Sequence, residues 1–363
     1  MPSLGTTIAA LARQRSETGS GDGRLKIVGG FGANPGQLTM KVHVPDHREP
    51  RAALVVVLHG CTQTAEDYAA PVGWLDLADR FGFVVLAPEQ RRANNPNLCF
   101  NWYVPADARR GSGEAASIAQ MVVHAVQTYG VDEGRVFVTG LSAGGAMTSV
   151  MLATYPEIFA GGAVVAGLPY GVAATLPEAL EAMATTSVGS ETELGLRVPA
   201  ATRRTGPWPT VTVWHGQSDG IVRPAAGEAV AAQWRDVHGV KERARTARTP
   251  DGRDFLVWLS PDGAPVVELH RIVGLGHGAA VKAAGPNGCG HASRYTPEIG
   301  VSSTFEIASG WGLVQRDAEG SPPRARPVDG SKELGQPAPT PDDPVGSISQ
   351  AINDALRAAG LVR

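Results

Sequence analysis

Buried strands alternate with helical segments along most of this 363-residue chain, and this alternation most constrains the fold. Continuous apolar runs rich in β-branched residues are typical of strands covered on both faces. When helix-length segments separate such strands, the pattern predicts an α/β fold with a doubly wound, mostly parallel sheet flanked by helices. The runs are ALVVVLHG, GFVVLAPE, RVFVTG, GAVVAG, TVTVWHG and VVELHRIVG.

The pattern predicts a single α/β domain over residues 24–316, which is long enough for an enzyme. Residues 168–209 interrupt the alternation, and we expect them to form a helical insertion over one edge of the sheet. Residues 1–23 alternate Gly, Ser and charge, which indicates a mobile N-terminal segment. The Pro- and Gly-rich residues 317–345 are expected to be an irregular tether, and the amphipathic residues 346–363 a helix that docks on the body.

The charge and apolar content exclude several classes of partner. The net charge is −3 without long runs of one sign, so we expect neither a nucleic-acid partner nor docking on anionic lipid. No stretch approaches 18 apolar residues, so no membrane span is expected. The N-terminus lacks the pattern of a secretory signal, which predicts a cytoplasmic protein, or a secreted one if a leader has been removed. Three cysteines without metal-ligand spacing predict no metal, and no cofactor motif is present.

The segment GLSAG, residues 140–144, fits the pattern G-x-S-x-G between a strand and a small-residue helix. In this context the serine sits on a strained turn, and the flanking glycines let neighbouring backbones pass close by. The alternative is a glycine-rich junction with an incidental serine. The strand before and the helix after favour Ser142 as a nucleophile.

A serine nucleophile needs a base and an orienting acid, which should follow in the order Asp or Glu, then His. Asp219 comes just after TVTVWHG, and His277 lies in LGHG after VVELHRIVG, so both follow buried strands. His291, in GCGHA, is the main competitor for the base but lies farther from a strand end. The weaker candidates, inside a strand, on a helix or in turns, are His270, Asp236, Asp251 and Asp262.

An oxyanion hole needs two backbone N–H groups aimed at the developing charge. The amide of Ala143, at the helix start after the nucleophile, is one candidate. The other is the amide of Cys61 in LHGCTQ, where Gly60 permits the turn. An ordinary turn at the end of a strand is the alternative for this second segment.

These and other motifs occur in the order seen in the polyhydroxybutyrate depolymerase family of esterases. The segments are HGCTQTAEDY, RRANNPNLCFNWY, RGSGEAASI, VFVTGLSAGGAM, YPEIFAGGA, AGLPYG, VWHGQSD and GLGHG, over residues 30–315. They resemble the type 1 catalytic domain, which is related to feruloyl and acetylxylan esterases. The resemblance implies an α/β-hydrolase fold, with the roles of nucleophile, acid, base and oxyanion amides at Ser142, Asp219, His277, Cys61 and Ala143.

The resemblance also places the loops of Cys61 and Cys99 together, which implies a disulfide beside the site. Two reduced thiols are the alternative, and a cytoplasmic address favours them. Trp102 and Tyr103, in FNWY, are expected to wall the substrate pocket, with core packing as the alternative. The third cysteine, Cys289, follows GLGHG in a Gly-rich stretch to which we assign no role.

The motifs predict a serine carboxylester hydrolase, and the resemblance implies short-chain esters as substrates, with poly- or oligo(3-hydroxybutyrate) as the expected class. Secreted members that degrade polymer carry a signal peptide and usually a polymer-binding module. Neither is recognised in this sequence, which favours small-molecule or oligomeric esters. The alternatives are a feruloyl or acetylxylan esterase, a peptidase on the same scaffold, or a non-catalytic binding protein. The oligomeric state has no signal in the sequence.

Overall fold

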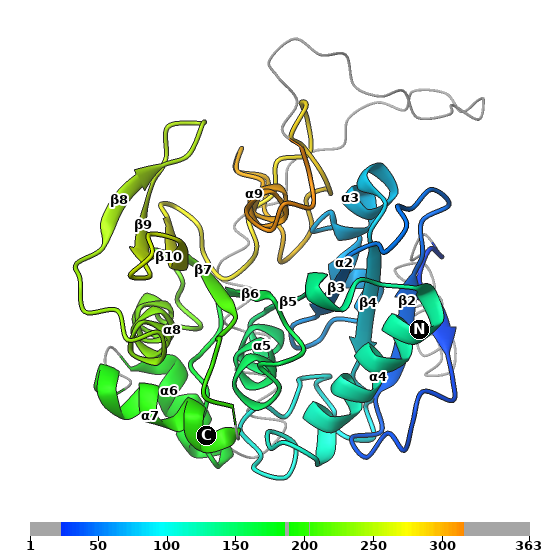
Figure 1. Cartoon of the computed structure of the whole chain (residues 1–363), viewed down its shortest axis with the longest axis horizontal. Coiled ribbons are helices and arrows are strands. Elements are labelled where there is room, and N and C mark those ends of the chain that lie inside the picture. The colour runs from blue at the N-terminus through cyan, green and yellow to red at the C-terminus, as the bar shows by residue number, and fades with distance from the viewer. Residues whose placement is uncertain (1–22, 186–188, 203, 316–363) are drawn as a thin grey trace, which may run out of the picture.

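A ten-stranded mixed sheet with helices on both faces forms the body of the protein (Figure 1). The computed structural model describes residues 23–185, 189–202 and 204–315. The predicted tether, the C-terminal helix and all but one residue of the N-terminal segment lie outside the described residues. The strand order is β1-β2-β4-β3-β5-β6-β7-β10-β9-β8.

The six apolar runs recognised in the sequence are the six strands that pair in parallel at the centre of the sheet. They are β3 (Leu54–Leu58), β4 (Val84–Glu89), β5 (Val136–Leu141), β6 (Gly161–Val165), β7 (Thr210–Gly216) and β10 (Pro265–Ile272). Antiparallel strands extend the sheet on both sides. These are β1 (Lys26–Val28), β2 (Thr39–His43), β8 (Arg245–Arg248) and β9 (Asp254–Leu259).

The helices α4, α5 and α8 cover one face of the sheet, and α3 and α9 cover the other (Figure 1). None of the helices in the described ranges is both long and apolar enough to cross a membrane. The helices are α2 (Ala65–Ala69), α3 (Trp74–Phe81), α4 (Gly113–Tyr129), α5 (Ala143–Thr154), α6 (Leu176–Ala184), α7 (Glu191–Ala201), α8 (Pro224–Val237) and α9 (Ser303–Gly310), with a short 3₁₀ turn at Glu133–Arg135.

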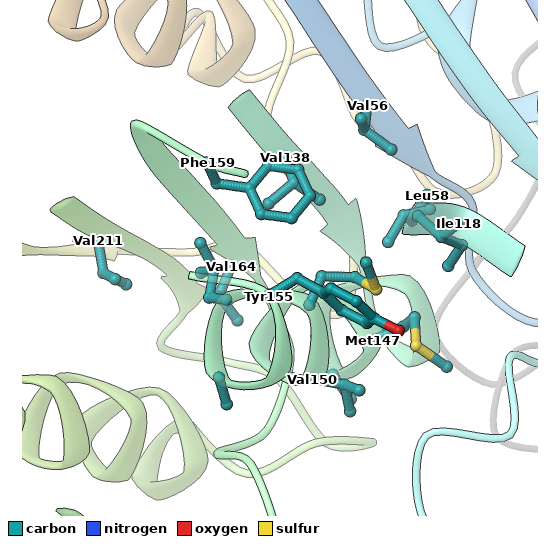
Figure 2. Packing of buried hydrophobic residues seen from close by; sticks show 14 of the residues in the cluster. Val56, Leu58, Ile118, Val138, Met147, Val150, Tyr155, Phe159, Val164 and Val211 are labelled. Carbon is teal, nitrogen blue, oxygen red and sulfur yellow. The ribbon is translucent and has the colours of Figure 1, made fainter. Parts of the chain in front are cut away.

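Strand β3 shows how the strands build a core on each face of the sheet. Val56 and Leu58 point into the cluster around Met147 and Val150 of α5 (Figure 2), whereas Val55 points into the opposite cluster. All five side chains of β3 are essentially fully buried. Burying such a side chain contributes about 1.5–3 kcal/mol, so β3 anchors both layers and fixes the position of the loop that follows it.

The predicted helical insertion is present as α6 and α7, but it does not cover an edge of the sheet. It connects β6 to β7, which are neighbours inside the sheet, so the connection must cross a face. There α7 packs against α5 and α8. The buried amide of Gln233 on α8 accepts a hydrogen bond from the N–H of Tyr170 (2.9 Å) and donates one to the carbonyl of Leu194 (2.8 Å).

Candidate active site

Ser142 occupies the turn between β5 and α5, at the carboxyl edge of the parallel strands. Its φ of 58° and ψ of −117° lie in a region that non-glycine residues rarely adopt and that stores strain. The turn is held by a hydrogen bond from the N–H of Ser142 to the carbonyl of Val165 (2.9 Å). The carbonyl of Ser142 also accepts from the N–H of Ala146 (2.8 Å). The surrounding backbone therefore maintains the strained turn.

The two glycines of GLSAG are required by close backbone contacts. A Cβ added to Gly144 would lie 2.2 Å from the carbonyl oxygen of Leu58, and one added to Gly140 would lie 2.4 Å from the carbonyl oxygen of Gly144. The first turn of α5 therefore packs directly on the end of β3. A Cβ on Gly60, in the loop after β3, would lie 3.7 Å from the Cβ of Ser142, so this loop runs beside the serine.

Asp219 and His277 form a hydrogen-bonded pair at the same edge of the sheet. The Nδ1 atom of His277 lies 2.8 Å from Oδ2 of Asp219, and the Asp219 side chain is fully buried. Oδ1 of Asp219 accepts the N–H groups of Ile221 and Val222, both at 2.9 Å. Because Nδ1 faces the carboxylate, the Nε2 atom of His277 is left for other chemistry.

Hydrogen bonding controls the charge of Asp219. Burial favours the neutral acid, but hydrogen bonds from His215 and His277 outweigh it and hold the pKa of Asp219 below that of an ordinary aspartate. The carboxylate is therefore ionised at neutral pH.

Packing between two loops brings this pair together. A Cβ on Gly216, the last residue of β7, would lie 2.2 Å from the carbonyl oxygen of Leu275. The N–H of Ser218 donates to that same carbonyl at 3.0 Å. The turn that carries Asp219 is thus joined to the loop that carries His277.

The loop after β3 is held by a buried histidine that the sequence analysis did not single out. The N–H of Gln90 donates to Nε2 of His59 (3.1 Å), so the ring proton lies on Nδ1, which donates to the carbonyl of Gly60 (2.8 Å). Burial lowers the pKa of His59 and favours this neutral ring. Because C=O and N–H point in opposite directions across a trans peptide, the N–H of Cys61 is directed away from His59.

The two backbone N–H groups expected to form an oxyanion hole have no hydrogen-bond acceptor within the described structure. The N–H of Cys61 donates to no described group. Ala143 is the first residue of α5, and N–H groups in the first turn of a helix have no intrahelical acceptor.

The structure joins Cys61 and Cys99 by a disulfide, with their Cα atoms 4.2 Å apart. The N–H of Thr62 also donates to the carbonyl of Asn97 at 2.6 Å. The loop after β3 is therefore tied, covalently and by hydrogen bonding, to the loop that carries Trp102.

Trp102 is 7% exposed and packs into the larger core cluster, with the half-buried Tyr103 edge-on at 5.4 Å. Trp102 therefore has little surface left for substrate, and a pocket role for these two residues stays a prediction. Their loop is held by the buried Glu114, which accepts the N–H of Asn101 (2.8 Å) and the side-chain amide of Gln90 (2.5 Å). Burial raises the pKa of Glu114 to about 8.

The family model of esterase PHB depolymerase matches residues 41–256, more than half of the chain. The chain belongs to this family. Members of the esterase PHB depolymerase family are esterases, so the chain is a carboxylic ester hydrolase, as the sequence motifs predicted.

Two curated relatives agree with this family membership, and a solved structure agrees with the fold. Poly(3-hydroxyalkanoate) depolymerase C of Paucimonas lemoignei is 42% identical over 300 residues, which cover 80% of this chain and 70% of the relative. Feruloyl esterase B of Talaromyces funiculosus is 30% identical over 262 residues, 70% of this chain and 72% of the relative. The acetyl xylan esterase structure from Aspergillus awamori matches with a TM-score of 0.66 at 24% identity, covering 80% of this chain and 100% of that one. The expected α/β-hydrolase fold is confirmed.

The structure separates the candidate histidines of this esterase. His270 is buried between the rings of Trp214 and Phe255, with centroids at 4.0 and 4.4 Å. His291 is exposed, and its backbone N–H donates to the carbonyl of Pro71 at 2.9 Å. Neither has a described contact with a candidate acid of the site.

The glycine-rich stretch after His277 packs back onto α3. The Sγ atom of the buried Cys289 lies 3.2 Å from Oγ of Ser302, and the N–H of Gly290 donates to the carboxylate of Asp76 at 3.0 Å. Burial raises the pKa of Cys289 to about 11, so this cysteine is a packed thiol.

Proposed function

We propose that this esterase hydrolyses short-chain carboxylic esters through an acyl-enzyme formed on Ser142. The observation that carries the proposal is the 2.8 Å hydrogen bond between His277 Nδ1 and the buried Asp219, at the sheet edge where Ser142 sits on its strained turn. Nucleophile, base and orienting acid are thereby supplied by loops after β5, β10 and β7. This chemistry needs no metal.

The reaction begins when Nε2 of His277 accepts the proton of the Ser142 hydroxyl as its oxygen attacks the ester carbonyl. Asp219 accepts a hydrogen bond from Nδ1–H, which fixes the tautomer and stabilises the imidazolium that forms. His277 then returns the proton to the departing alcohol, leaving the acyl group on Ser142. Water, deprotonated by His277, then attacks this acyl-enzyme, and His277 returns the proton to the departing Ser142 oxygen as the acid is released.

The negative charge of each tetrahedral intermediate is held by the N–H groups of Cys61 and Ala143. The orientation of Cys61 is supported by the His59–Gly60 hydrogen bond and by the disulfide to Cys99, so the donor is preorganised before substrate binds.

For the substrate class, we propose 3-hydroxybutyrate oligomers and other short-chain esters. This is supported by the 42% identity to poly(3-hydroxyalkanoate) depolymerase C. The second candidate is a feruloyl or acetylxylan esterase, favoured by the feruloyl esterase B relative and the acetyl xylan esterase structure. Values of kcat/KM for hydroxybutyrate oligomers, methyl ferulate, acetylated xylan and p-nitrophenyl esters of graded length would separate the two.

Replacing the nucleophile tests the proposal. Ser142→Ala should reduce ester turnover by a factor on the order of 10⁴–10⁶ and abolish labelling by a fluorophosphonate probe. Ser149→Ala is the matched control, because it removes a buried hydroxyl without a described hydrogen-bond partner from α5, the helix that follows Ser142. Undiminished turnover in the Ser142→Ala chain would contradict the mechanism.

A further inference from the structure

Asp219 has a second histidine beside its carboxylate. His215, near the end of β7, is 2% exposed. Its Nε2 atom lies 2.9 Å from the carbonyl oxygen of Val222 and 3.4 Å from Oδ2 of Asp219. The mechanism above does not use this ring.

The contacts fix which nitrogen of His215 donates. A carbonyl oxygen only accepts hydrogen bonds, so the Nε2 atom that faces Val222 carries a proton. The opposite nitrogen, Nδ1, has no hydrogen-bond partner among the described residues. It faces Gly227 of α8, where an added Cβ would lie 2.7 Å from Nδ1. The ring is therefore clamped with its Nε2–H directed at the turn that carries Asp219.

We propose that His215 is a positioning residue for Asp219, which holds the acid in the orientation that His277 requires; this inference rests on the proposed function. The N–H of Val222 donates to Asp219 Oδ1, while its C=O accepts from His215. Both backbone groups of Val222 therefore hold the turn after β7, one bonded to Asp219 and the other to His215. The same Nε2–H adds a long contact to Oδ2, the oxygen that receives His277.

Two effects on the kinetics follow from this role. Without the His215 donor, the Asp219 carboxylate loses orientation, so the imidazolium of the transition state is less stabilised and kcat falls while KM changes little. The titratable groups that face Asp219 are His215 on β7 and His277 in the loop after β10. Because a hydrogen bond to the charged carboxylate favours ionisation, its loss makes Asp219 easier to protonate. The acid limb of the kcat profile reports the hydrogen-bonded His277–Asp219 pair as a unit, so removal of the His215 donor should shift this limb.

The test compares two side chains of similar size at position 215. His215→Met removes the donor, and His215→Gln retains an N–H near the position of Nε2. We expect the methionine change to lower kcat by about 10- to 100-fold, the range that corresponds to one hydrogen bond to a charged group, and to shift the acid limb. The glutamine change should keep kcat within about threefold of wild type. Rates are expressed per fluorophosphonate-reactive site, so that partial unfolding does not imitate the effect.

A double-mutant cycle with Asp219→Asn separates positioning from general damage. If His215 acts through Asp219, His215→Met should cost less than about threefold in the Asp219→Asn background. His270→Phe is the control, because His270 is a buried histidine on the neighbouring strand β10 whose ring stacks on Trp214, and it should leave the acid limb unchanged.

Equal losses in both backgrounds, or a folded His215→Met chain with wild-type kcat, would overturn the inference. If the methionine chain does not fold, the glutamine chain decides alone, and a loss beyond threefold or a shifted acid limb contradicts the proposal. An Asp219→Asn chain with full turnover would instead overturn the proposed function, so the two failures are distinguishable.

Discussion

His277 and His291 both lie in glycine-rich loops after β10, but their surroundings differ. The ring of His277 meets a buried carboxylate that is already oriented by two backbone N–H groups. The ring of His291 is exposed on a loop that packs against Pro71. Because a general base must be held within hydrogen-bond reach of the proton it accepts, the oriented ring of His277 is the better candidate.

If His277 is the base of the proposed triad, His277→Ala is expected to reduce kcat by a factor on the order of 10⁴, close to the loss expected for Ser142→Ala, because the members of a triad act as a unit. His291→Ala should stay within a few-fold of wild type. Steady-state kinetics on a p-nitrophenyl ester, with circular dichroism to check folding, measure both. The reverse order of effects would assign the base to His291.

The positions of Ser142, Asp219 and His277 at one edge of the sheet were predictable, because each residue stands in a short motif directly after an apolar run. His59 and Glu114 were not, because their roles arise from contacts with Gln90, which lies 31 and 24 residues away along the chain. His215 is four residues from Asp219, but a strand pattern alone does not say which neighbours its ring meets.

At the scale of elements, the contact between α5 and β3 places Ser142, the proposed nucleophile. Alanine normally favours a helix over glycine by about 1 kcal/mol. At position 144 the added Cβ would lie 2.2 Å from a carbonyl oxygen of the β3 backbone, which cannot move aside as a flexible side chain would. Steric conflict should therefore outweigh helix propensity.

Gly144→Ala is expected to lower the melting temperature by several degrees and kcat by at least about tenfold, since a misplacement of about 1 Å can cost 10²-fold. Gly310→Ala, at the end of α9, is the control because an added Cβ there meets no atom within 4 Å. Thermal unfolding and ester kinetics on both variants give the comparison. A Gly144→Ala enzyme as stable and active as wild type would show that α5 tolerates displacement from β3.

The sequence identified the strands of the parallel centre more readily than the β8–β9 hairpin. Parallel strands buried on both faces read as continuous apolar runs, as in β3 and β5, whose residues are all buried. In contrast, β9 is buried only in part and β8 is mostly exposed. An antiparallel hairpin with one solvent-exposed face has no continuous apolar run, so RTAR and DFLVWL were not recognised as strands.

For the molecule as a whole, the buried Glu114 links global stability to pH. Its pKa in the folded protein is about 8, above that of an exposed glutamate. The folded state therefore holds a proton that the unfolded chain releases in mild acid. The resulting stabilisation is fully present below about pH 4.5 and is lost as pH rises toward 8.

The free energy of unfolding should accordingly decrease between pH 5 and pH 9, by up to about 1.4 kcal/mol per pH unit from this group. Glu114→Gln should be less stable than wild type at pH 5, because an amide cannot accept from both Asn101 and Gln90. That deficit should shrink toward pH 9. Urea unfolding at several pH values measures this difference in stability, and Glu133→Gln, at an exposed glutamate, is the control. A deficit that does not change with pH would rule out titration of Glu114 as the cause.

The two outermost strands of the described sheet have a consequence for behaviour at high concentration. An unpaired strand edge is a template on which another chain can add, and short or charged edges discourage this. Here β1 has three residues and begins with the exposed Lys26. At the other end, β8 has four residues and presents the exposed Arg245. A second copy that approaches either edge meets a short ladder and positive charge, which disfavours growth of intermolecular β-structure.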